Sequence, residues 1–442
     1  IESVPNSQSI YFKNATIWTN ESDGILKNAD ILIDDGKILS IGKNIETPDG
    51  FKVIDASNKH ITSGIIDEHS HMAASSINEG GHNSSAEVSI MDVINPDDIN
   101  VYRNLAGGVT SAQILHGSAN PIGGQSAIIK LKWGSEINDM YFEGAAPFIK
   151  FALGENVKQS NWSGSRFPQT RMGVEQVFVD HFDRAKEYAK TWEEYNSLSP
   201  RQKRSVTKPR FDDELETLWE ILRGDRFVSS HSYVQSEINM LMKVAEKFNF
   251  RINTFTHILE GYKVADKMAE HGVGGSTFSD WWGYKYEVND AIPYNASIMH
   301  NAGVTVALNS DNSELSRRLN LEAAKAVKYG DISEEEAWKF VTLNPAKLLH
   351  LDAHMGSIKV GKDADIVLWT DNPLSIYAKV VQTYVDGKLL FDIEVDKELR
   401  ARDKAERIRI IKLMSSDNNE GEKRKPQPTK EILYHCDTEH EE

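Results

Sequence analysis

Two histidines, His69 and His71, are separated by one residue and follow the run Gly-Ile-Ile-Asp-Glu over residues 64–68. In a β-strand, residues two apart point to the same side, so both imidazoles can reach one point. Imidazole nitrogens are frequent ligands of divalent metals such as zinc. Because the chain has 14 histidines, a chance pair on the surface is the alternative, and the choice depends on residues further along the chain.

Further candidate ligands come at the ends of later segments that the sequence predicts to be buried strands. In a (β/α)8 barrel, functional side chains sit at the carboxyl ends of different strands, which all open onto one face. Taken alone, each candidate has an ordinary explanation, such as a core histidine or an aspartate that caps a helix. Their joint placement favours one metal site built from His69, His71, Lys150, Glu155, His231, His257 and Asp311.

The elements that would position these residues form an α/β pattern. Over residues 61–351, apolar β-type runs alternate with helical patterns, such as the 3.6-residue periodicity of 215–222 and 238–248. This alternation predicts a parallel α/β fold, most simply a (β/α)8 TIM-type barrel. Residues 156–212 are long for one connection and indicate an inserted lid or an oligomer contact.

Both ends of the chain are rich in short β-type runs. Asp35-Gly36 and Asp386-Gly387 each separate two such runs and predict hairpin turns. Neither end is large enough to bury a core alone, so we expect residues 1–60 and 352–395 to form one composite β-sandwich domain. Residues 396–442 are predicted to be a charged helix followed by a mobile polar tail.

The composition restricts the partners. The net charge of −16 argues against nucleic acid or an anionic membrane surface as the main partner. A single cysteine, Cys436, excludes an internal disulfide and a cysteine-rich zinc site, and we expect its thiol to be inert. No apolar run is long enough to span a membrane, so we expect a soluble protein. The first residue is Ile1, which is typical of a processed or trimmed product, and leaves a cytoplasmic or an exported location open.

The ligand pattern resembles that of the metal-dependent amidohydrolase superfamily. Residues 28–38 (NADILI-x-x-GKI) and 356–367 (GSI-x-x-GK-x-ADIV) are similar to β-segments of that superfamily, and the likeness extends over residues 10–390. The segment 116–125 (HGSANPIGGQ) is closest to the imidazolonepropionase and Xaa-Pro dipeptidase-like branch. One departure is that the family's usual Pro-Gly before the first strand is Ser63-Gly64 here.

The resemblance implies an enzyme that hydrolyses a C–N bond in an amide, cyclic amide or dipeptide with water activated by one or two divalent ions, with zinc expected. Asp311 would take a proton from the water and pass it to the leaving nitrogen. His257 or His231 would bind a metal or polarise the carbonyl oxygen. Relatives use either a carboxylated lysine or a glutamate on the fourth strand, so Lys150 and Glu155 both remain open, as does a salt bridge between them.

Two other functions are considered. A deaminase of the same superfamily is the first alternative, and a catalytically silent barrel kept as a scaffold is the second. Because silent relatives tend to lose a ligand and this chain retains all of them, an enzyme is favoured, and we expect a homo-oligomer. Gly123-Gly124 is predicted to be a tight turn. The side chains expected to contact a small-molecule substrate, with loop packing as the alternative for each, are His116, Gln125, Tyr233, Arg166 and Arg171.

Overall fold

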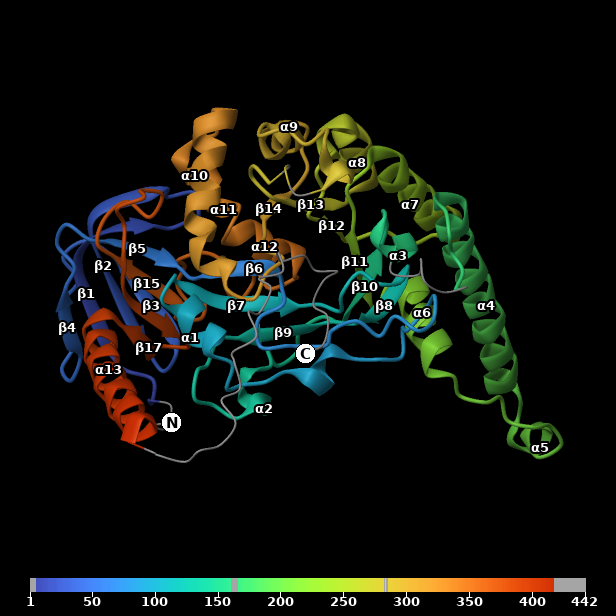
Figure 1. Cartoon of the computed structure of the whole chain (residues 1–442), viewed down its shortest axis with the longest axis horizontal. Coiled ribbons are helices and arrows are strands. Elements are labelled where there is room, and N and C mark those ends of the chain that lie inside the picture. Colours follow the sequence, from blue (N-terminus) through green and yellow to red (C-terminus); the bar gives the residue numbers. More distant parts are fainter. Residues whose placement is uncertain (1–4, 160–165, 282, 284, 417–442) are drawn as a thin grey trace.

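The structure is a computed structural model that describes residues 5–159, 166–281, 283 and 285–416. A β-rich region and a larger α/β body lie along its longest axis (Figure 1). Part of the predicted insertion (160–165) and most of the predicted tail, including Cys436, lie outside the described residues. None of the described helices combines the length and the apolarity that crossing a membrane requires.

The β-rich region is one sheet built from both ends of the chain. Its order is β17-β16-β15-β5-β1-β2-β3, with β4 beside β1, and β15 pairs antiparallel with β5. The central residues of both predicted hairpin turns, Asp35-Gly36 and Asp386-Gly387, have positive φ, as a type I′ turn requires. The strands are β1 (Ile10–Trp18), β2 (Ile25–Asp34), β3 (Lys37–Gly42), β4 (Lys52–Asp55), β5 (His60–Ser63), β15 (Ile366–Trp369), β16 (Val380–Val385) and β17 (Lys388–Asp392).

The α/β body contains two further sheets, with the orders β14-β13-β12-β11-β10-β8 and β6-β7-β9. Neighbouring strands run parallel from β10 to β14 and from β6 to β7, while β8 and β9 pair antiparallel with their neighbours. The strands are β6 (Ile65–Ser70), β7 (Val109–Ile114), β8 (Ile122–Gln125), β9 (Ala127–Lys130), β10 (Phe148–Ala152), β11 (Phe227–His231), β12 (Thr254–Thr256), β13 (Gly274–Thr277) and β14 (Val306–Leu308).

Helices connect and cover these strands. The two periodic segments predicted to be helices are α6 and α7, and the insertion contains the long helix α4, which packs beside α6 and α7 (Figure 1). The helices are α1 (Ile99–Leu105), α2 (Ile137–Met140), α3 (Asn156–Gln159), α4 (Arg171–Ser197), α5 (Pro200–Lys203), α6 (Asp213–Arg223), α7 (Gln235–Phe248), α8 (Ala265–His271), α9 (Asn295–Asn301), α10 (Leu319–Gly330), α11 (Glu334–Lys339), α12 (Leu343–Leu348) and α13 (Ile393–Ser416).

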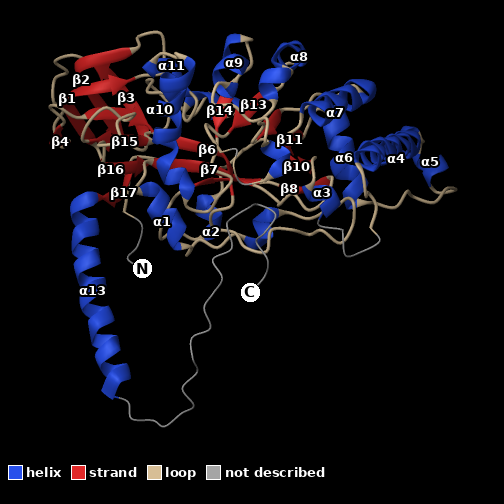
Figure 2. Ribbon diagram, turned by 45° about the horizontal axis from the view of Figure 1, so that its top comes forward, coloured by secondary structure: helices blue, strands red, loops and turns tan. Residues whose placement is uncertain are grey.

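The charged helix predicted after the last strand is present as α13. It extends away from the rest of the molecule (Figure 2), and Asp396 is its one buried residue. Ion pairs within the helix, such as Arg400 with Asp396 and Arg409 with Glu406, contribute to its stability.

The predicted tight turn at Gly123-Gly124 is wrong, because both glycines lie inside β8, which pairs antiparallel with β10. The glycines permit close packing. A Cβ atom on Gly123 would lie 2.9 Å from Nδ1 of His116, and one on Gly124 would lie 2.7 Å from a methyl group of Val88. Both positions are therefore glycine because neighbouring side chains lie too close for a Cβ atom, and not because the chain turns there.

Candidate metal centre

Five strands bring the predicted ligands to one edge of the body. His69 lies near the end of β6 with His71 just beyond it, and Lys150 lies within β10. His231 ends β11, His257 follows β12, and Asp311 follows β14. All of these side chains are buried, with Asp311 the most accessible at 7% exposure. The carboxyl ends of parallel strands thus converge these residues, as the sequence predicted.

Asp311 lies at the centre of the histidines. Its Oδ1 atom is 3.1 Å from Nε2 of His69 and 3.1 Å from Nε2 of His71. Its Oδ2 atom is 3.9 Å from Nε2 of His257. Potential ligand atoms of His69, His257 and Asp311 all lie within 4.8 Å of one another. The ring of His231 packs edge-on to His257, with the centroids 4.2 Å apart.

The two fourth-strand candidates have different surroundings. Nζ of Lys150 is 3.2 Å from Nε2 of His69, so this lysine is part of the histidine cluster. Glu155 lies beyond the end of β10, and its carboxylate is 3.8 Å from Nζ of Lys285. The backbone N–H of Glu155 donates to the carboxylate of Glu287. The structure therefore brings Lys150, and not Glu155, to the histidines.

Two of the ligand positions have unusual backbone conformations. His257 has φ = 38° and Asp311 has φ = 48°, in the left-handed region that non-glycine residues rarely adopt. Such strain costs about 1–3 kcal/mol per residue and clusters at functional sites. At Asp311, the backbone N–H donates to the carbonyl oxygen of His69 at 2.9 Å, which joins the end of β14 to β6.

Buried polar groups hold the ligand loops and rings in place. Asp67 accepts hydrogen bonds from the hydroxyls of Ser310 and Ser316, which fixes the loop that carries Asp311. Nδ1 of His231 lies 2.8 Å from the hydroxyl of Ser118, and Nδ1 of His69 lies 2.7 Å from the hydroxyl of Thr256. Hydrogen bonds at one ring nitrogen orient the other one toward a metal. Sequence reasoning missed Ser118, Thr256 and Ser310, because buried serines and threonines at strand ends are too common to single out.

The electrostatics keep the imidazoles of His69, His231 and His257 neutral and the carboxylate ionised. Burial lowers the pKa of His69 and of His231 well below the ordinary value, and it lowers the pKa of His257 to about 3. Burial alone would raise the pKa of Asp311. His257 and the hydrogen bond from His71 outweigh that effect and lower this pKa to about 2. Neutral imidazoles and an ionised carboxylate are the protonation states that bind a metal.

The donor atoms fit a divalent cation. Nε2 of a neutral histidine with its lone pair toward Asp311 would place two acceptors 3.1 Å apart, which is unfavourable in a buried site unless a cation lies between them. Neither ring nitrogen of His257 has a hydrogen-bond partner among the described residues, and the same holds for Nδ1 of His71. Buried polar atoms of this kind normally have partners, so the residues present suit a bound metal.

Tyr233 is the predicted substrate contact that lies beside the cluster. Its ring centroid is 4.6 Å from that of His231 and 5.1 Å from that of His257. Nζ of Lys285 lies over the tyrosine ring, 4.4 Å from its centroid. Tyr233 therefore packs between the histidine cluster and the ammonium group of Lys285.

The other four predicted substrate contacts each make hydrogen bonds or ion pairs within the protein. His116 accepts from the N–H of Glu79 through Nε2 and contacts the carbonyl of Gly117 through Nδ1. Gln125 donates to the carbonyl of Ala86 and to the hydroxyl of Thr217. The guanidinium of Arg166 donates to the backbone carbonyls of Gly80, His82, Ala119 and Val157. Arg171 pairs with Glu237 and Glu287.

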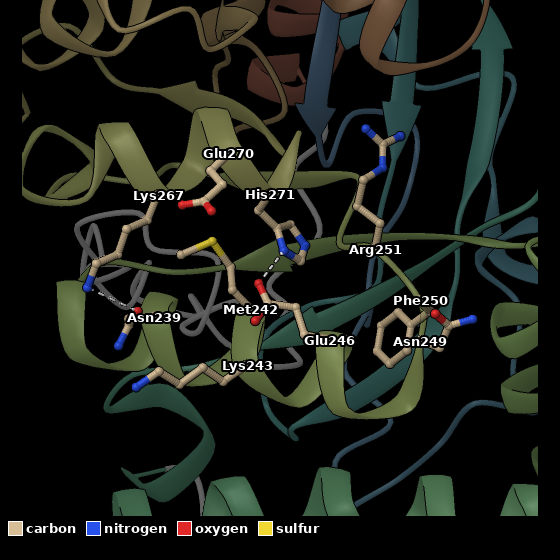
Figure 3. Close-up of a pocket in the computed structure, with 10 residues that line it drawn as sticks. All are labelled: Asn239, Met242, Lys243, Glu246, Asn249, Phe250, Arg251, Lys267, Glu270 and His271. Atoms are coloured by element: carbon tan, nitrogen blue, oxygen red, sulfur yellow. Dashed lines mark hydrogen bonds and ion pairs between the residues drawn. The ribbon is translucent and has the colours of Figure 1, made fainter.

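An open cavity of about 800 Å³ lies between α7 and α8 (Figure 3). These helix ends lead into the amino ends of β12 and β13, so the cavity is on the side opposite the histidine cluster. Its one histidine, His271, contacts Glu246 through Nδ1 at 3.1 Å and accepts from the N–H of Ile252 through Nε2. Both ring nitrogens are therefore in use, and the cavity lacks a comparable set of ligands.

Comparisons with known proteins agree with this geometry. Residues 294–390 match the Amidohydrolase family. The crystal structure of an amidohydrolase from Thermotoga maritima has a TM-score of 0.80 and 32% identity, and the similarity covers 87% of this chain and 100% of that one. The amidohydrolase tasK of Hapsidospora irregularis is 30% identical over 86% of this chain, which spans only 43% of the length of that relative. An imidazolonepropionase of Picrophilus torridus is 26% identical over 80% of this chain and 90% of its own length.

These similarities confirm the resemblance predicted from the sequence, including the imidazolonepropionase-like branch. The fold is accordingly the TIM-barrel-like α/β fold of this group, at the level that the similarity in structure supports. The chain belongs to the amidohydrolase family, whose members are hydrolases that act on carbon–nitrogen bonds.

Proposed function

We propose that this protein is a metal-dependent hydrolase that cleaves a C–N bond of a small amide, cyclic amide or dipeptide. The observation that carries the proposal is the position of Asp311, an ionised carboxylate in contact with His69, His71 and His257. An aspartate that only caps a helix does not need three buried imidazoles around it. A general base beside a metal does, because those imidazoles would bind the metal.

We propose zinc as the metal, bound by residues of the cluster His69, His71, Lys150, His231, His257 and Asp311. Imidazole and carboxylate ligands suit zinc, and a zinc site does not require cysteine. When bound, a divalent cation would lower the pKa of a water molecule and polarise the substrate carbonyl. We place Lys150 as the fourth-strand ligand, in a carboxylated form, because it contacts His69 while Glu155 contacts Lys285. The cluster would hold one or two ions.

The chain's own residues supply the proton transfers and the orientation. Asp311 accepts a proton from the attacking water and returns it to the leaving nitrogen, so that it ends the cycle ionised again. His257 or His231 holds the carbonyl oxygen of the substrate as negative charge develops on it. Tyr233, which packs against both rings, limits the space on that side of the substrate.

The Asp311→Asn variant tests this proposal. Asparagine keeps the size of the side chain but cannot take the proton, so we expect kcat to fall by at least ~10²-fold, with the fold intact and metal still bound. The measurement is kcat on any hydrolysed substrate together with the melting temperature and the metal content. A helix-capping role predicts near-normal turnover, because asparagine is also a good cap, and that result would reject the assignment.

The products distinguish the alternatives. Release of ammonia from a substrate would identify a deaminase, and the absence of turnover in the metal-loaded protein across amides, cyclic amides and dipeptides would favour a silent scaffold. Retention of the whole ligand set favours the enzyme, because a scaffold has no use for a strained, buried His–Asp cluster.

We also propose the finer architecture expected from the sequence. In it, residues 61–351 form a closed (β/α)8 barrel, 1–60 with 352–395 form a β-sandwich domain, and 396–442 form a separate tail. The hydrogen bond from Asp311 to His69 supports closure between β14 and β6, and the pairing of β15 with β5 supports a shared domain. A crystal structure tests both. Light scattering tests the expected homo-oligomer, and a monomeric mass would reject it.

A further inference from the structure

The hydroxyl of Thr256 links a metal-ligand candidate to a buried carboxyl group. Its Oγ1 atom lies 2.7 Å from Nδ1 of His69 and donates to Oε2 of Glu68 at 3.2 Å. Thr256 lies on β12, whereas Glu68 and His69 are neighbours on β6, a strand of a different sheet. All three side chains are fully buried. These contacts form a hydrogen-bonded chain across the interior of the body, just beneath the metal centre.

The direction of each hydrogen bond in this chain follows from the side of the ring that faces the proposed metal centre. Nε2 of His69 lies 3.1 Å from Asp311 and 3.2 Å from Nζ of Lys150, so a metal bound among these residues would take the lone pair of Nε2. In a neutral imidazole the proton then resides on Nδ1, which donates to Oγ1 of Thr256. The single hydroxyl proton of Thr256 is left to donate to Glu68, as its geometry indicates. The Nδ1–H of His69 and the hydroxyl of Thr256 therefore each meet an acceptor.

The position of Glu68 needs an explanation of its own. Barrel interiors are filled mainly by branched apolar side chains, and burial of a carboxyl group is costly unless it is hydrogen-bonded. Without an acceptor behind it, the Thr256 hydroxyl could turn its proton toward Nδ1 of His69. The ring would then carry its own proton on Nε2, the atom that faces Asp311. The Oε2 atom of Glu68 accepts the hydroxyl proton and so removes that possibility.

We propose that Glu68, acting through Thr256, is a positioning residue that holds the proton of His69 on Nδ1 and so directs the Nε2 lone pair toward the metal. This inference rests on the metal centre proposed above and adds two residues to it. Neither Glu68 nor Thr256 touches the substrate or the reacting atoms. Their effect reaches the metal only through the tautomer and orientation of His69.

The Thr256→Val variant removes the hydroxyl and keeps the shape of the side chain. We expect the affinity for zinc, measured by competition with a chelator, to fall by about 10–100-fold. Thr256→Ser should restore it to within about threefold of the wild type, since serine retains the hydroxyl. The matched control is Thr254→Val, a buried threonine on the same strand whose hydroxyl accepts from the side chain of Asn253. That control should leave zinc affinity unchanged.

A second variant keeps the idea testable if Thr256→Val fails to fold. Glu68→Leu retains the Thr256 hydroxyl but removes its acceptor, so we expect His69 to lose its fixed tautomer and zinc affinity to fall as well. The ¹⁵N chemical shifts of the imidazole in metal-free protein report the tautomer directly. We expect Nδ1–H in the wild type and a mixture of both tautomers in Glu68→Leu. A role in packing alone would lower the melting temperature and leave the tautomer as it is.

The possible outcomes separate this inference from the proposed function. If zinc affinity survives in Thr256→Val and in Glu68→Leu within about twofold, or if the wild-type ring carries its proton on Nε2, the positioning role is wrong. If the His69→Ala, His71→Ala double variant still binds zinc fully, the metal centre itself is wrong. Loss of zinc in the double variant with no effect at Thr256 would reject only the positioning role.

Discussion

Two groups of side chains in this protein could each hold a metal ion by distance alone. In both groups the potential ligand atoms lie within 4.8 Å of one another among the described residues. The two groups differ in the charge of the side chains that surround their ligand atoms. The histidine group consists of His69, His257 and Asp311, and the aspartate group consists of Asp363, Asp365 and Asp386.

The aspartate group already contains its cation. Nζ of Lys130 lies 2.7 Å from Asp363 and 3.2 Å from Asp365, and it also contacts Asp386. Burial opposes the charge of Lys130, but the three carboxylates outweigh this effect and raise its pKa above the ordinary value. Lys132 adds a further contact to Asp386 at 2.8 Å. The group is therefore an internal ion network that ties β9 to the C-terminal part of the chain.

The histidine group has a different charge balance. Its imidazoles are neutral because burial lowers their pKa values, so they offer lone pairs and no charge. Nζ of Lys150 contacts the ring of His69, and the carboxylation proposed for this lysine would replace its positive charge by a negative one. Clustered ligand atoms therefore do not by themselves predict a metal. What matters is whether the chain supplies the countercharge, as it does through Lys130 in the aspartate group.

The largest expected effect concerns removal of two ligands from the histidine group. The His69→Ala, His71→Ala double variant should lose its bound metal and its activity, because both imidazoles contact the carboxylate at the centre. The measurement is metal content by elemental analysis after dialysis, together with turnover. The matched control, Asp363→Asn in the aspartate group, should keep the metal content of the wild type. Equal metal loss in both proteins would remove the distinction between the groups.

The next effect is on stability. Lys130→Met leaves three clustered carboxylates without their main cation, so the free energy of unfolding should fall by about 3–5 kcal/mol. Urea denaturation measures this change, and kcat per folded molecule should stay close to that of the wild type. A loss below about 1 kcal/mol would mean that Lys130 is not the internal cation of this group.

The smallest effect depends on pH. Burial raises the pKa of Asp386, but Lys130 and Lys132 lower it below the ordinary value of 3.8. A carboxyl group with a lowered pKa in the folded state contributes stability above its unfolded pKa and loses that contribution as the pH falls. The free energy of unfolding of the wild type should thus exceed that of Asp386→Asn by about 1 kcal/mol at about pH 7, and this difference should shrink at about pH 3. A difference that is equal at both pH values would contradict the ion network.

The sequence predicted the parts of the site that depend on strand ends. His69, His231, His257 and Asp311 could be found because each follows a short buried run, and parallel strands converge such ends on one edge. The hairpin turns were predictable for an equally local reason, since Asp-Gly tolerates positive φ.

What the sequence could not predict depends on contacts between distant segments. Thr256 and Glu68 meet across two sheets, and no local pattern marks either of them. The choice between Lys150 and Glu155 required knowing where β10 ends and that Lys285 lies beside Glu155. The Gly123-Gly124 pair was predicted to be a turn because the sequence does not show which side chains pack on it. In the structure, His116 and Val88 lie too close to β8 for a Cβ atom at these positions.

Anomalous X-ray scattering at the zinc edge, recorded from crystals of the zinc-loaded enzyme, is the decisive measurement for the proposed metal centre, because one map covers both groups. We expect a strong peak bounded by His69, His257 and Asp311, with Nε2 of His69 as a ligand at about 2.0–2.1 Å. We expect no peak at the aspartate group, where Lys130 lies. A peak among the three aspartates, or none beside the histidines in an active crystal, would contradict the assignment of the metal to the histidine group.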